Sequence, residues 1–452
     1  MKKFIQTVTD IWKIEELRNK ILITLGFMVI YRFAAQVTLP GLDGKAVADA
    51  MNSKPAGGGG IFDLINMFTG GGFSRASVMA LGVMPYISAS IVVQLMGIAI
   101  PYLQKLQKDG ESGRKKINQI TRWLTIAITL VQGPAYLANL PAVTGIPASA
   151  YILGPTNIVF LFSSIILLTA GSVFAMWLGE KITDKGIGNG ISLLIMIGII
   201  AGFPGAFAQE FTSKTTDGGA GGIMMILIEM IVWLVVILAC VYLVTAIRKV
   251  AVQYARKTVA GTVDSVSGAR QYVPLKLNSA GVMPIIFAQA IMFVPSAIQG
   301  ANFASEGVKK VAGYFSDFNG VGYNALFALL IIIFSYFYTA ITIPTNKMAD
   351  DLKRSGGFIP GIRPGKETGD LLDRVLSLIT FPGSLFLALL AILPAFVVKF
   401  GVQQSWSMFY GGTSLLIMVG VAIDTIQQIN SHLLNRHYDG LMKTGTKRKS
   451  VA

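Results

Sequence analysis

Long apolar segments recur along this chain, and they constrain its fold more than any other feature. Ten stretches are apolar enough over about 20 residues to cross a bilayer as a helix. Charged residues make up 13% of the 452 residues, about half of the share that is usual in soluble domains. The sequence therefore predicts an all-α membrane protein with about ten transmembrane helices. They lie near residues 21–40, 76–100, 119–139, 152–178, 187–208, 222–247, 277–299, 322–343, 376–398 and 406–427.

The lysines and arginines are distributed unequally between the segments that connect these spans. Alternate segments, including both chain ends, hold 30 of the 38 basic residues, whereas the segments on the other side hold 7. Membrane proteins carry such an excess in their cytoplasmic loops. The pattern therefore predicts that both termini are cytoplasmic. The N-terminal stretch is basic and shows no small-residue cleavage site before residue 21, which favours a retained anchor.

Ten spans also allow a division into two halves of five. Residues 211–222 read FTSKTTDGGAGG, a flexible glycine-rich outer loop between the fifth and sixth spans. Because each half would have an odd number of spans, the halves would have inverted topologies, a plan that is common in transporters and channels. We predict pseudo-symmetric inverted halves. Residues 1–215 would hold helices 1–5, and residues 216–452 would hold helices 6–10 with long cytoplasmic loops at about 248–276 and 344–375.

One apolar segment is too short to cross a membrane. Ile61–Phe73 has apolar side chains at helical spacing but reaches three glycines, 70–72, after about a dozen residues. It lies on the outer side in the predicted topology. A re-entrant helix surrounded by protein or water would fit this segment, and so would an amphipathic helix lying on the outer surface.

The sequence lacks the motifs of several functional classes. It has no P-loop for nucleotide hydrolysis, and its lone Cys240 cannot form a disulfide within the chain. Charged residues inside the predicted spans, such as Arg32, Glu229 and Asp424, are scattered along the sequence. We expect no catalytic residue, no metal and no cofactor. A secondary transporter, which would need a buried charged site, and a membrane enzyme or insertase are the alternatives to a channel.

Five long blocks stand out along the chain: FDLINMFTGGGFSRASVMALGVMPYISASIVVQLMGIAIPYLQKLQKDGESGRKKINQITR (62–122), MWLGEKITDKGIGNGIS (176–192), LKLNSAGVMPIIFA (275–288), GGFIPGIRPGKET (356–368) and YGGTSLLI (410–417). These blocks resemble the bacterial SecY family, the channel subunit of the general secretory translocon. The resemblance implies a protein-conducting channel of the cell inner membrane that translocates unfolded secretory polypeptides and releases hydrophobic segments laterally into lipid. It also implies SecE and SecG subunits, the SecA motor ATPase, a translating ribosome and chains with signal sequences as partners.

The resemblance assigns the inside of the channel to particular residues. The short outer segment, roughly 61–75, would be the plug that seals the closed channel. The family also narrows its pore with a ring of apolar side chains. Val83 and Ile87 are four residues apart and so share one helix face, as a ring requires. The apolar pore ring would consist of Val83, Ile87, Ile195, Ile286, Ile291 and Ile417. The plug residues would be Ile61, Phe62, Leu64, Ile65, Met67 and Phe68.

The resemblance also implies a lateral gate and a cytoplasmic docking surface. Interhelical hydrogen bonds in membranes are worth about 0.6 kcal/mol each, weak enough for a gate that opens. The cytoplasmic loops carry more positive charge than topology requires, which suits docking of the motor or of ribosomal RNA. The gate residues would be Ser88, Gln94, Thr121 and Asn278. The docking residues would be Arg248, Lys249, Arg256, Lys257, Lys353, Arg354, Arg363 and Lys366.

Overall fold

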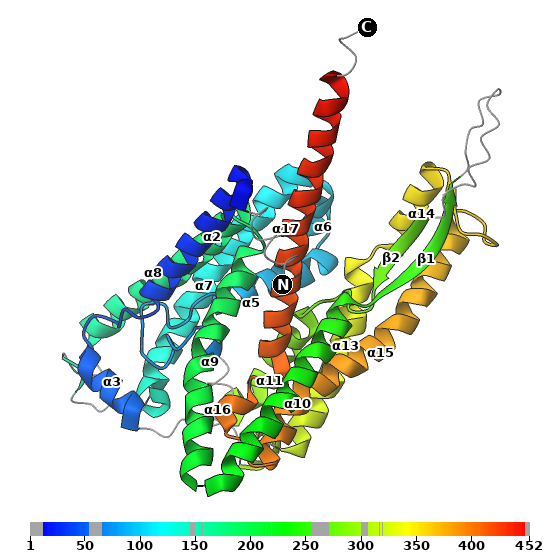
Figure 1. Ribbon diagram of the computed structural model, residues 1–452. Coiled ribbons are helices and arrows are strands. Elements are labelled where there is room, and N and C mark those ends of the chain that lie inside the picture. Colours follow the sequence, from blue (N-terminus) through cyan, green and yellow to red (C-terminus); the bar gives the residue numbers. More distant parts are fainter. Residues whose placement is uncertain are drawn as a thin grey trace, which may run out of the picture. The chain divides into compact units, whose positions relative to one another are not determined.

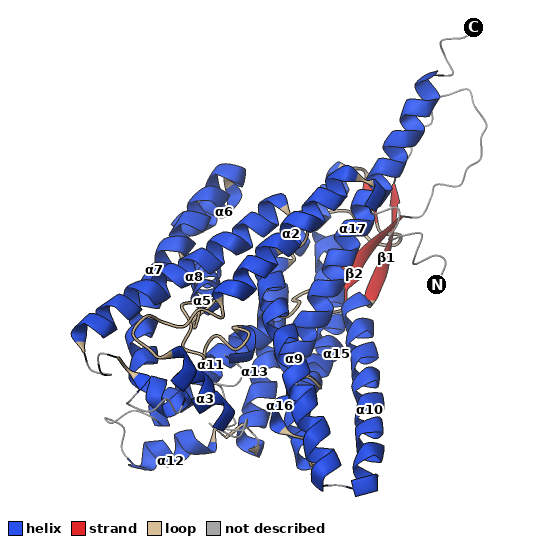
Figure 2. Ribbon diagram, turned by 60° about the vertical axis from the view of Figure 1, so that its left-hand side comes forward, coloured by secondary structure: helices blue, strands red, loops and turns tan. Residues whose placement is uncertain are grey.

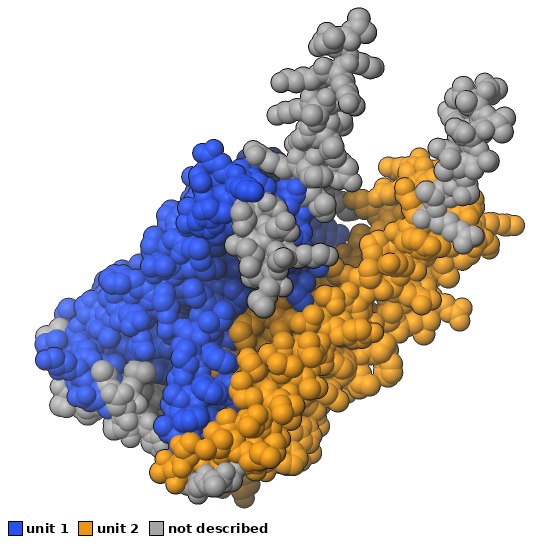
Figure 3. Space-filling model, in the orientation of Figure 1, with its two compact units in different colours: residues 1–212, 404–406, 421–452 blue, residues 213–403, 407–420 orange. Residues whose placement is uncertain are grey.

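The computed structural model describes residues 12–53, 66–144, 150–152, 154, 157–217, 219–254, 271–299, 306–315, 317–318 and 320–447. The chain forms two compact units, which Figure 3 colours separately. Unit 1 comprises residues 1–212, 404–406 and 421–452. Unit 2 comprises residues 213–403 and 407–420. The predicted division into residues 1–215 and 216–452 stays a prediction.

Unit 1 is a bundle of helices built around α7. In this unit α7 packs against α5, α6 and α8, and α2 packs against α8 (Figure 1). The side chain of Asn157 caps α8 by accepting a hydrogen bond from the Val159 amide at 2.9 Å. The helices between residues 15 and 217 are α2 (Glu15–Ala34), α3 (Gly44–Ser53), α5 (Met84–Ala99), α6 (Pro101–Lys108), α7 (Gly110–Thr144), α8 (Ile158–Lys185) and α9 (Gly190–Asp217).

Unit 2 combines long helices with a small sheet. Helix α13 packs against both α11 and α15, and α14 packs against α15 (Figure 1). Helices α9, α16 and α17 contribute residues to both units. The further elements are α10 (Gly219–Thr245), β1 (Ile247–Tyr254), β2 (Gln271–Lys276), α11 (Met283–Gln299), α12 (Glu306–Tyr314), α13 (Val321–Thr342), α14 (Thr345–Arg354), β3 (Gly357–Phe358), α15 (Lys366–Lys399), α16 (Gln404–Ser407) and α17 (Gly412–Lys447).

The three strands form a sheet that the all-α prediction did not include. Figure 2 shows β1 and β2 side by side in red, and the strand order is β2-β1-β3 with antiparallel pairs. Val250 lies opposite Val273, and Gln253 lies opposite Phe358. The basic residues that open β1 point to a cytoplasmic loop, but the β-branched residues that follow favour a strand. The sheet shares one apolar cluster with α14 and α15: Val252, Leu275, Leu352, Ile359, Leu372 and Leu376.

The helical prediction is confirmed, whereas the count of ten spans stays a prediction. Each of the ten predicted spans contains a helix, and six helices in the described part are long and apolar enough to cross a membrane. The pair Met84–Gly97 and Pro101–Gln107, bent by 103°, would make a seventh. Helix α11 has only 17 residues. The six are Ile158–Lys185, Gly190–Thr216, Gly222–Thr245, Val321–Arg354, Lys366–Lys399 and Gln404–Leu433.

Leu372 tests the cluster beneath the sheet. This side chain is 0% exposed, so Leu372→Ala leaves a cavity and should lower the free energy of unfolding by about 2–5 kcal/mol. Leu378→Ala on the same helix is the control, because Leu378 is 67% exposed. Thermal unfolding in detergent measures both. Equal effects of the two substitutions would contradict the packing described here.

Candidate functional site

In unit 1, two of the predicted ring residues open helix α5. Val83 is the N-cap of α5 and is buried, and the Ile87 amide donates a hydrogen bond to its carbonyl at 3.0 Å. Ile87 is half-buried. The third residue of this unit, Ile195, lies on α9 and is buried. All three side chains are aliphatic, so they offer no polar group that could hold water or an ion.

In unit 2, the predicted ring residues lie on α11 and α17. Ile286 is half-buried in the first turn of α11, and Ile291, further along, is 41% exposed. Ile417 on α17 is buried. The six residues are thus divided equally between the units. Their assembly into one ring stays a prediction.

The same four residues, Gly-Val-Met-Pro, occur at the start of both α5 and α11, as 82–85 and 281–284. The glycines, Gly82 and Gly281, have φ of +51° and +62°, a left-handed conformation that glycine adopts at no steric cost. Each helix then starts at the methionine, with proline in the first turn, where a missing N–H costs nothing. Ile87 and Ile286 each follow that methionine by three residues. The two predicted ring positions therefore occupy the same place in two identically started helices.

The predicted plug lies only partly in the described residues. Ile61, Phe62, Leu64 and Ile65 fall outside them, whereas Met67 is half-buried and Phe68 is buried. We call residues 66–75 the plug base. The Asn66 carbonyl accepts the Gly71 amide at 2.8 Å, and the Asn66 side chain accepts the Ser74 amide at 2.9 Å. These bonds fold the plug base into a closed turn.

The plug base is joined to two helices of unit 1. Arg32 on α2 donates to the Gly70 carbonyl at 2.5 Å, and the Tyr136 hydroxyl on α7 donates to the Phe73 carbonyl at 2.7 Å. The Arg75 guanidinium donates to the Gln36 side chain at 3.1 Å. The predicted span from residue 76 consequently begins as a helix only at Met84, since turns tied to α2 and α7 occupy the residues before it.

Three of the predicted gate residues bond within their own helices. Ser88 donates to the Met84 carbonyl at 3.1 Å, and Thr121 donates to the Ile117 carbonyl at 2.9 Å. Gln94 donates to the Ser90 hydroxyl at 3.2 Å, also within α5. Asn278 lies in the turn before α11. Within the described residues these three side chains thus bond locally, and their role in a gate stays a prediction.

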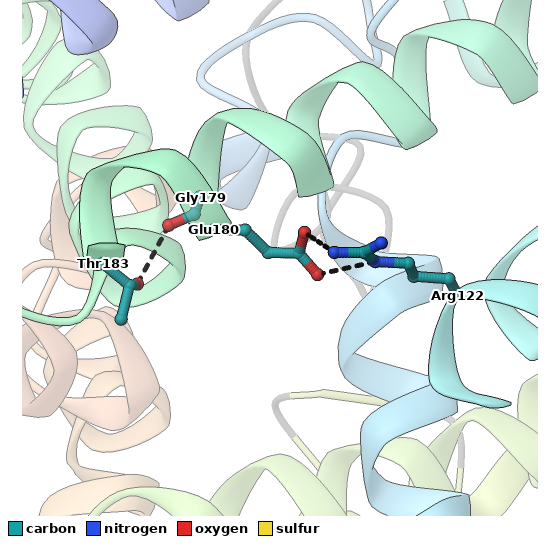
Figure 4. A network of polar contacts seen from close by, with 4 residues as sticks. All are labelled: Arg122, Gly179, Glu180 and Thr183. Carbon is teal, nitrogen blue, oxygen red and sulfur yellow. Dashed lines mark hydrogen bonds and ion pairs between the residues drawn. The ribbon is translucent and has the colours of Figure 1, made fainter. Parts of the chain in front are cut away.

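An ion pair next to Thr121 joins α7 to α8 (Figure 4). Arg122 Nε lies 3.0 Å from Glu180 Oε1, and Arg122 Nη2 lies 2.5 Å from Glu180 Oε2. Two such parallel bonds fix both position and angle. One turn further along α8, Thr183 donates to the Gly179 carbonyl at 2.9 Å and accepts the Gly190 amide at 2.9 Å, which connects α8 to the start of α9.

The described docking residues are all exposed. They lie on the strand β1, on the last turn of α14 and at the start of α15, all in unit 2. Arg363 is presented on a turn whose backbone is fixed, because Thr368 donates to the Arg363 carbonyl at 2.9 Å. The exposed residues are Arg248, Lys249, Lys353, Arg354, Arg363 and Lys366. Arg256 and Lys257 lie outside the described residues.

Comparisons with known proteins agree over most of the chain. The family model SecY matches residues 77–426. The protein translocase subunit SecY of Streptomyces coelicolor is 39% identical over 438 residues, which cover 96% of this chain and 98% of that protein. The chain belongs to the SecY family. It is therefore a multi-pass membrane protein, and the resemblance seen in the sequence is confirmed.

Solved structures show the same fold at lower identity. A protein-conducting channel matches with a TM-score of 0.63 and 21% identity over 92% of each chain. A second structure, which concerns the plug domain of the SecY protein and its role in the closed state, matches with a TM-score of 0.59 and 19% identity, again over 92% of each chain. At such identities these matches establish the SecY-like fold of this chain.

Two charged residues of this SecY-family chain gain partners that the sequence did not indicate. Glu229 on α10 is buried and lies 3.5 Å from the Lys214 ammonium, which also donates to the Gly401 carbonyl at 2.8 Å. The Tyr410 hydroxyl donates to the Glu229 carbonyl at 2.8 Å. A charge near the bilayer is tolerated when paired in this way. The described residues contain no group of histidine, cysteine or carboxylate side chains that could hold a metal ion.

Ala76, which directly follows the plug base, has a φ of +48° and is 0% exposed. Ala76→Gly should stabilise the chain slightly, because relief of about 1–2 kcal/mol of strain exceeds glycine's cost of about 0.5–1 kcal/mol in backbone entropy. Ala76→Val should destabilise it, since a branched side chain adds to the strain. Melting temperatures in detergent rank the three proteins. A glycine variant that melts below the alanine protein would contradict the backbone conformation.

The Arg122–Glu180 pair should act by positioning rather than by stabilising. The side chains are 52% and 19% exposed, so water screens the attraction, and we expect a coupling energy of no more than about 1 kcal/mol. A double-mutant cycle with Arg122→Gln and Glu180→Gln measures this coupling in detergent. Arg114→Gln, an exposed arginine on the same helix, controls for loss of charge. A coupling several times larger would show that the pair stabilises the bundle directly.

Proposed function

We propose that this chain is the protein-conducting channel of a translocon in the cell inner membrane, through which unfolded secretory polypeptides cross. The observation that carries the proposal is the similarity to a protein translocase subunit along 96% of the chain. The channel itself would catalyse no covalent step. Energy would come from the SecA motor and ATP, from the membrane potential or from translation, and SecE and SecG would be the partner subunits.

Ten spans in two inverted halves, with both termini cytoplasmic, belong to this proposal. Support comes from the start of α5 and α11, where Gly-Val-Met-Pro occurs once in each unit with the same glycine conformation. Repeats of this kind are a sign of internal symmetry in transport proteins. The bias of lysines and arginines supports the orientation.

The pore ring would close the channel to water while it admits a polypeptide. An apolar constriction loses water spontaneously, and flexible aliphatic side chains can adjust to a passing chain. The aliphatic character of Val83, Ile87, Ile195, Ile286, Ile291 and Ile417 supports this role. The plug, including Met67 and Phe68, would fill the resting channel, and the folded turn of the plug base supports a compact plug.

A lateral gate near Ser88, Gln94, Thr121 and Asn278 would release hydrophobic segments into lipid. A central leucine favours the bilayer by about 0.3–0.6 kcal/mol, whereas a central lysine, arginine or aspartate costs about 2.5–3.5 kcal/mol. Ten leucines would therefore gain roughly 3–6 kcal/mol in lipid, and one or two charges would cancel that gain. Because partitioning makes the choice, the gate needs no side chain that recognises a particular sequence. The hydrogen bonds of the three helical gate residues lie within single helices, and separation of the helices would not break them.

The exposed basic residues of unit 2 would dock the SecA motor or a translating ribosome. Their support is the arrangement on rigid elements: a sheet, a helix end and the fixed turn at Arg363. Positive side chains displayed in this way attract RNA phosphates or acidic protein surfaces.

Crosslinking tests the channel directly. Cys240→Ala removes the only native thiol, and Ile87→Cys places one at the proposed ring. A secretory chain with its own cysteine is stalled midway through export, and we expect a disulfide between the two. The control is Leu378→Cys, which lies on the exposed face of α15 and should not react. No crosslink at Ile87→Cys, with the stalled chain bound, would overturn the channel and favour a transporter.

A further inference from the structure

The Arg32 side chain holds the plug base from one side. Arg32 lies in the last turn of α2, inside a predicted span, and its guanidinium is half-buried. It donates to the carbonyl of Gly70, 38 residues away in sequence, at 2.5 Å. A charge-assisted bond to a carbonyl is stronger than a bond between neutral groups. The guanidinium is thus aimed at one backbone atom of the plug base.

Helix α9 meets the plug base at Gly198. A Cβ atom added to Gly198 would lie 2.6 Å from the Phe68 carbonyl oxygen and 3.2 Å from the Gly70 amide nitrogen. Side chains do not approach backbone atoms so closely, so the absence of a side chain at residue 198 lets the two backbones touch. Gly70 itself has a φ of +64°. The side chain of Phe68, whose carbonyl faces Gly198, is buried.

We propose that Arg32 and Gly198 form the seat that keeps the plug in its resting position, with Arg32 as a positioning residue. This inference rests on the proposed function, since it assigns the regulation of the same channel. The seat consists of described residues only: Arg32 on α2, Gly198 on α9, and residues 66–70 of the plug base.

The two contacts act differently. The contact with Gly198 requires only space, whereas the bond from Arg32 requires a charged donor that is costly to leave unsolvated within a membrane. When the plug base leaves, the guanidinium needs water or another acceptor. An open aqueous channel supplies such groups, and a sealed one does not. The seat therefore favours the closed state until a polypeptide brings water to Arg32.

The residues that follow the seat, from Phe73 onward, are held by hydrogen bonds that do not involve Arg32 or Gly198. Tyr136 donates to the Phe73 carbonyl at 2.7 Å, the Val78 amide donates to the Val37 carbonyl at 2.9 Å, and the Leu39 amide donates to the Ala76 carbonyl at 2.9 Å. Loss of the Arg32 bond should consequently release residues 66–70 while the chain from Phe73 onward stays bonded to α7 and to the segment that follows α2. Variants of the seat should then open the channel without unfolding it.

Ion leak through the resting channel tests the seat. The full chain with its partner subunits is reconstituted in planar bilayers, without any translocating polypeptide, as the native protein and as Arg32→Gln or Gly198→Ala. We expect several-fold higher conductance for both variants. In a separate export assay, we expect both variants to export a reporter whose signal sequence has been weakened. The controls are Arg18→Gln on α2 and Gly205→Ala on α9, where an added Cβ meets nothing within 4 Å.

A labelling experiment shows whether the plug base itself moves. Met67→Cys is introduced together with Cys240→Ala. The rate at which the new thiol reacts with a maleimide is compared between the protein with Arg32 and Gly198 intact and the proteins that also carry Arg32→Gln or Gly198→Ala. We expect several-fold faster labelling in both variants and partial return to the native rate with Arg32→Lys, which keeps a charged donor. Continued export of an ordinary secretory chain shows that each variant is folded.

The outcomes separate the seat from the channel. If both variants export normally, leak no more than the native protein and label Met67→Cys at the native rate, the seat is wrong and the channel stands. If Arg32→Gln does not fold, Gly198→Ala, which acts from another helix, decides the question alone. If stalled chains never reach Ile87→Cys in the native protein, the proposed function itself has failed.

Discussion

The exclusion of water from the bilayer interior is the constraint on which the rest of this structure depends. A backbone amide or carbonyl without a partner costs several kcal/mol in hydrocarbon, so a chain this apolar satisfies its backbone within helices. The stretch at 69–83, which forms turns rather than a helix, must meet the same demand by other means. Its amides and carbonyls bond within the turn at Asn66 and to Val37 and Leu39, in the segment that follows α2. The plug base is therefore a folded unit of its own.

Glycines decide how closely the backbones of unit 1 approach one another. A Cβ at Gly171 on α8 would collide with the Val78 carbonyl, and a Cβ at Gly198 on α9 would collide with the Phe68 carbonyl. Gly190 meets the Gly179 carbonyl where α8 turns into α9. Small residues allow such contacts in membrane bundles, where apolar packing against lipid offers little driving force. The stretch that includes the plug base is thus held by two helices that present backbone to it.

Three charged side chains acquire partners in the fold. Arg32 meets a carbonyl, Glu229 meets Lys214, and Arg122 meets Glu180, each within one unit. None of these contacts resembles the concentrated ionisable site that a small-molecule transporter would use. They instead fix particular places: the plug base, the beginning of unit 2 and the junction of α7 with α8.

The sequence by itself determined the helical character, the positions of the main apolar segments and the family, because length, apolarity and long motif blocks are properties of the chain. It also contained the repeated Gly-Val-Met-Pro, a signal of symmetry that periodicity alone does not reveal. Only the tertiary structure decided that residues 76–83 are turns and that residues 247–254 and 271–276 form strands. Only the tertiary structure decided, too, that Arg32 bonds to Gly70 and that α17 contributes to both units. The reason is physical. Backbone carbonyls are chemically the same at every residue, so the partner of each one is set by which segments the fold brings together.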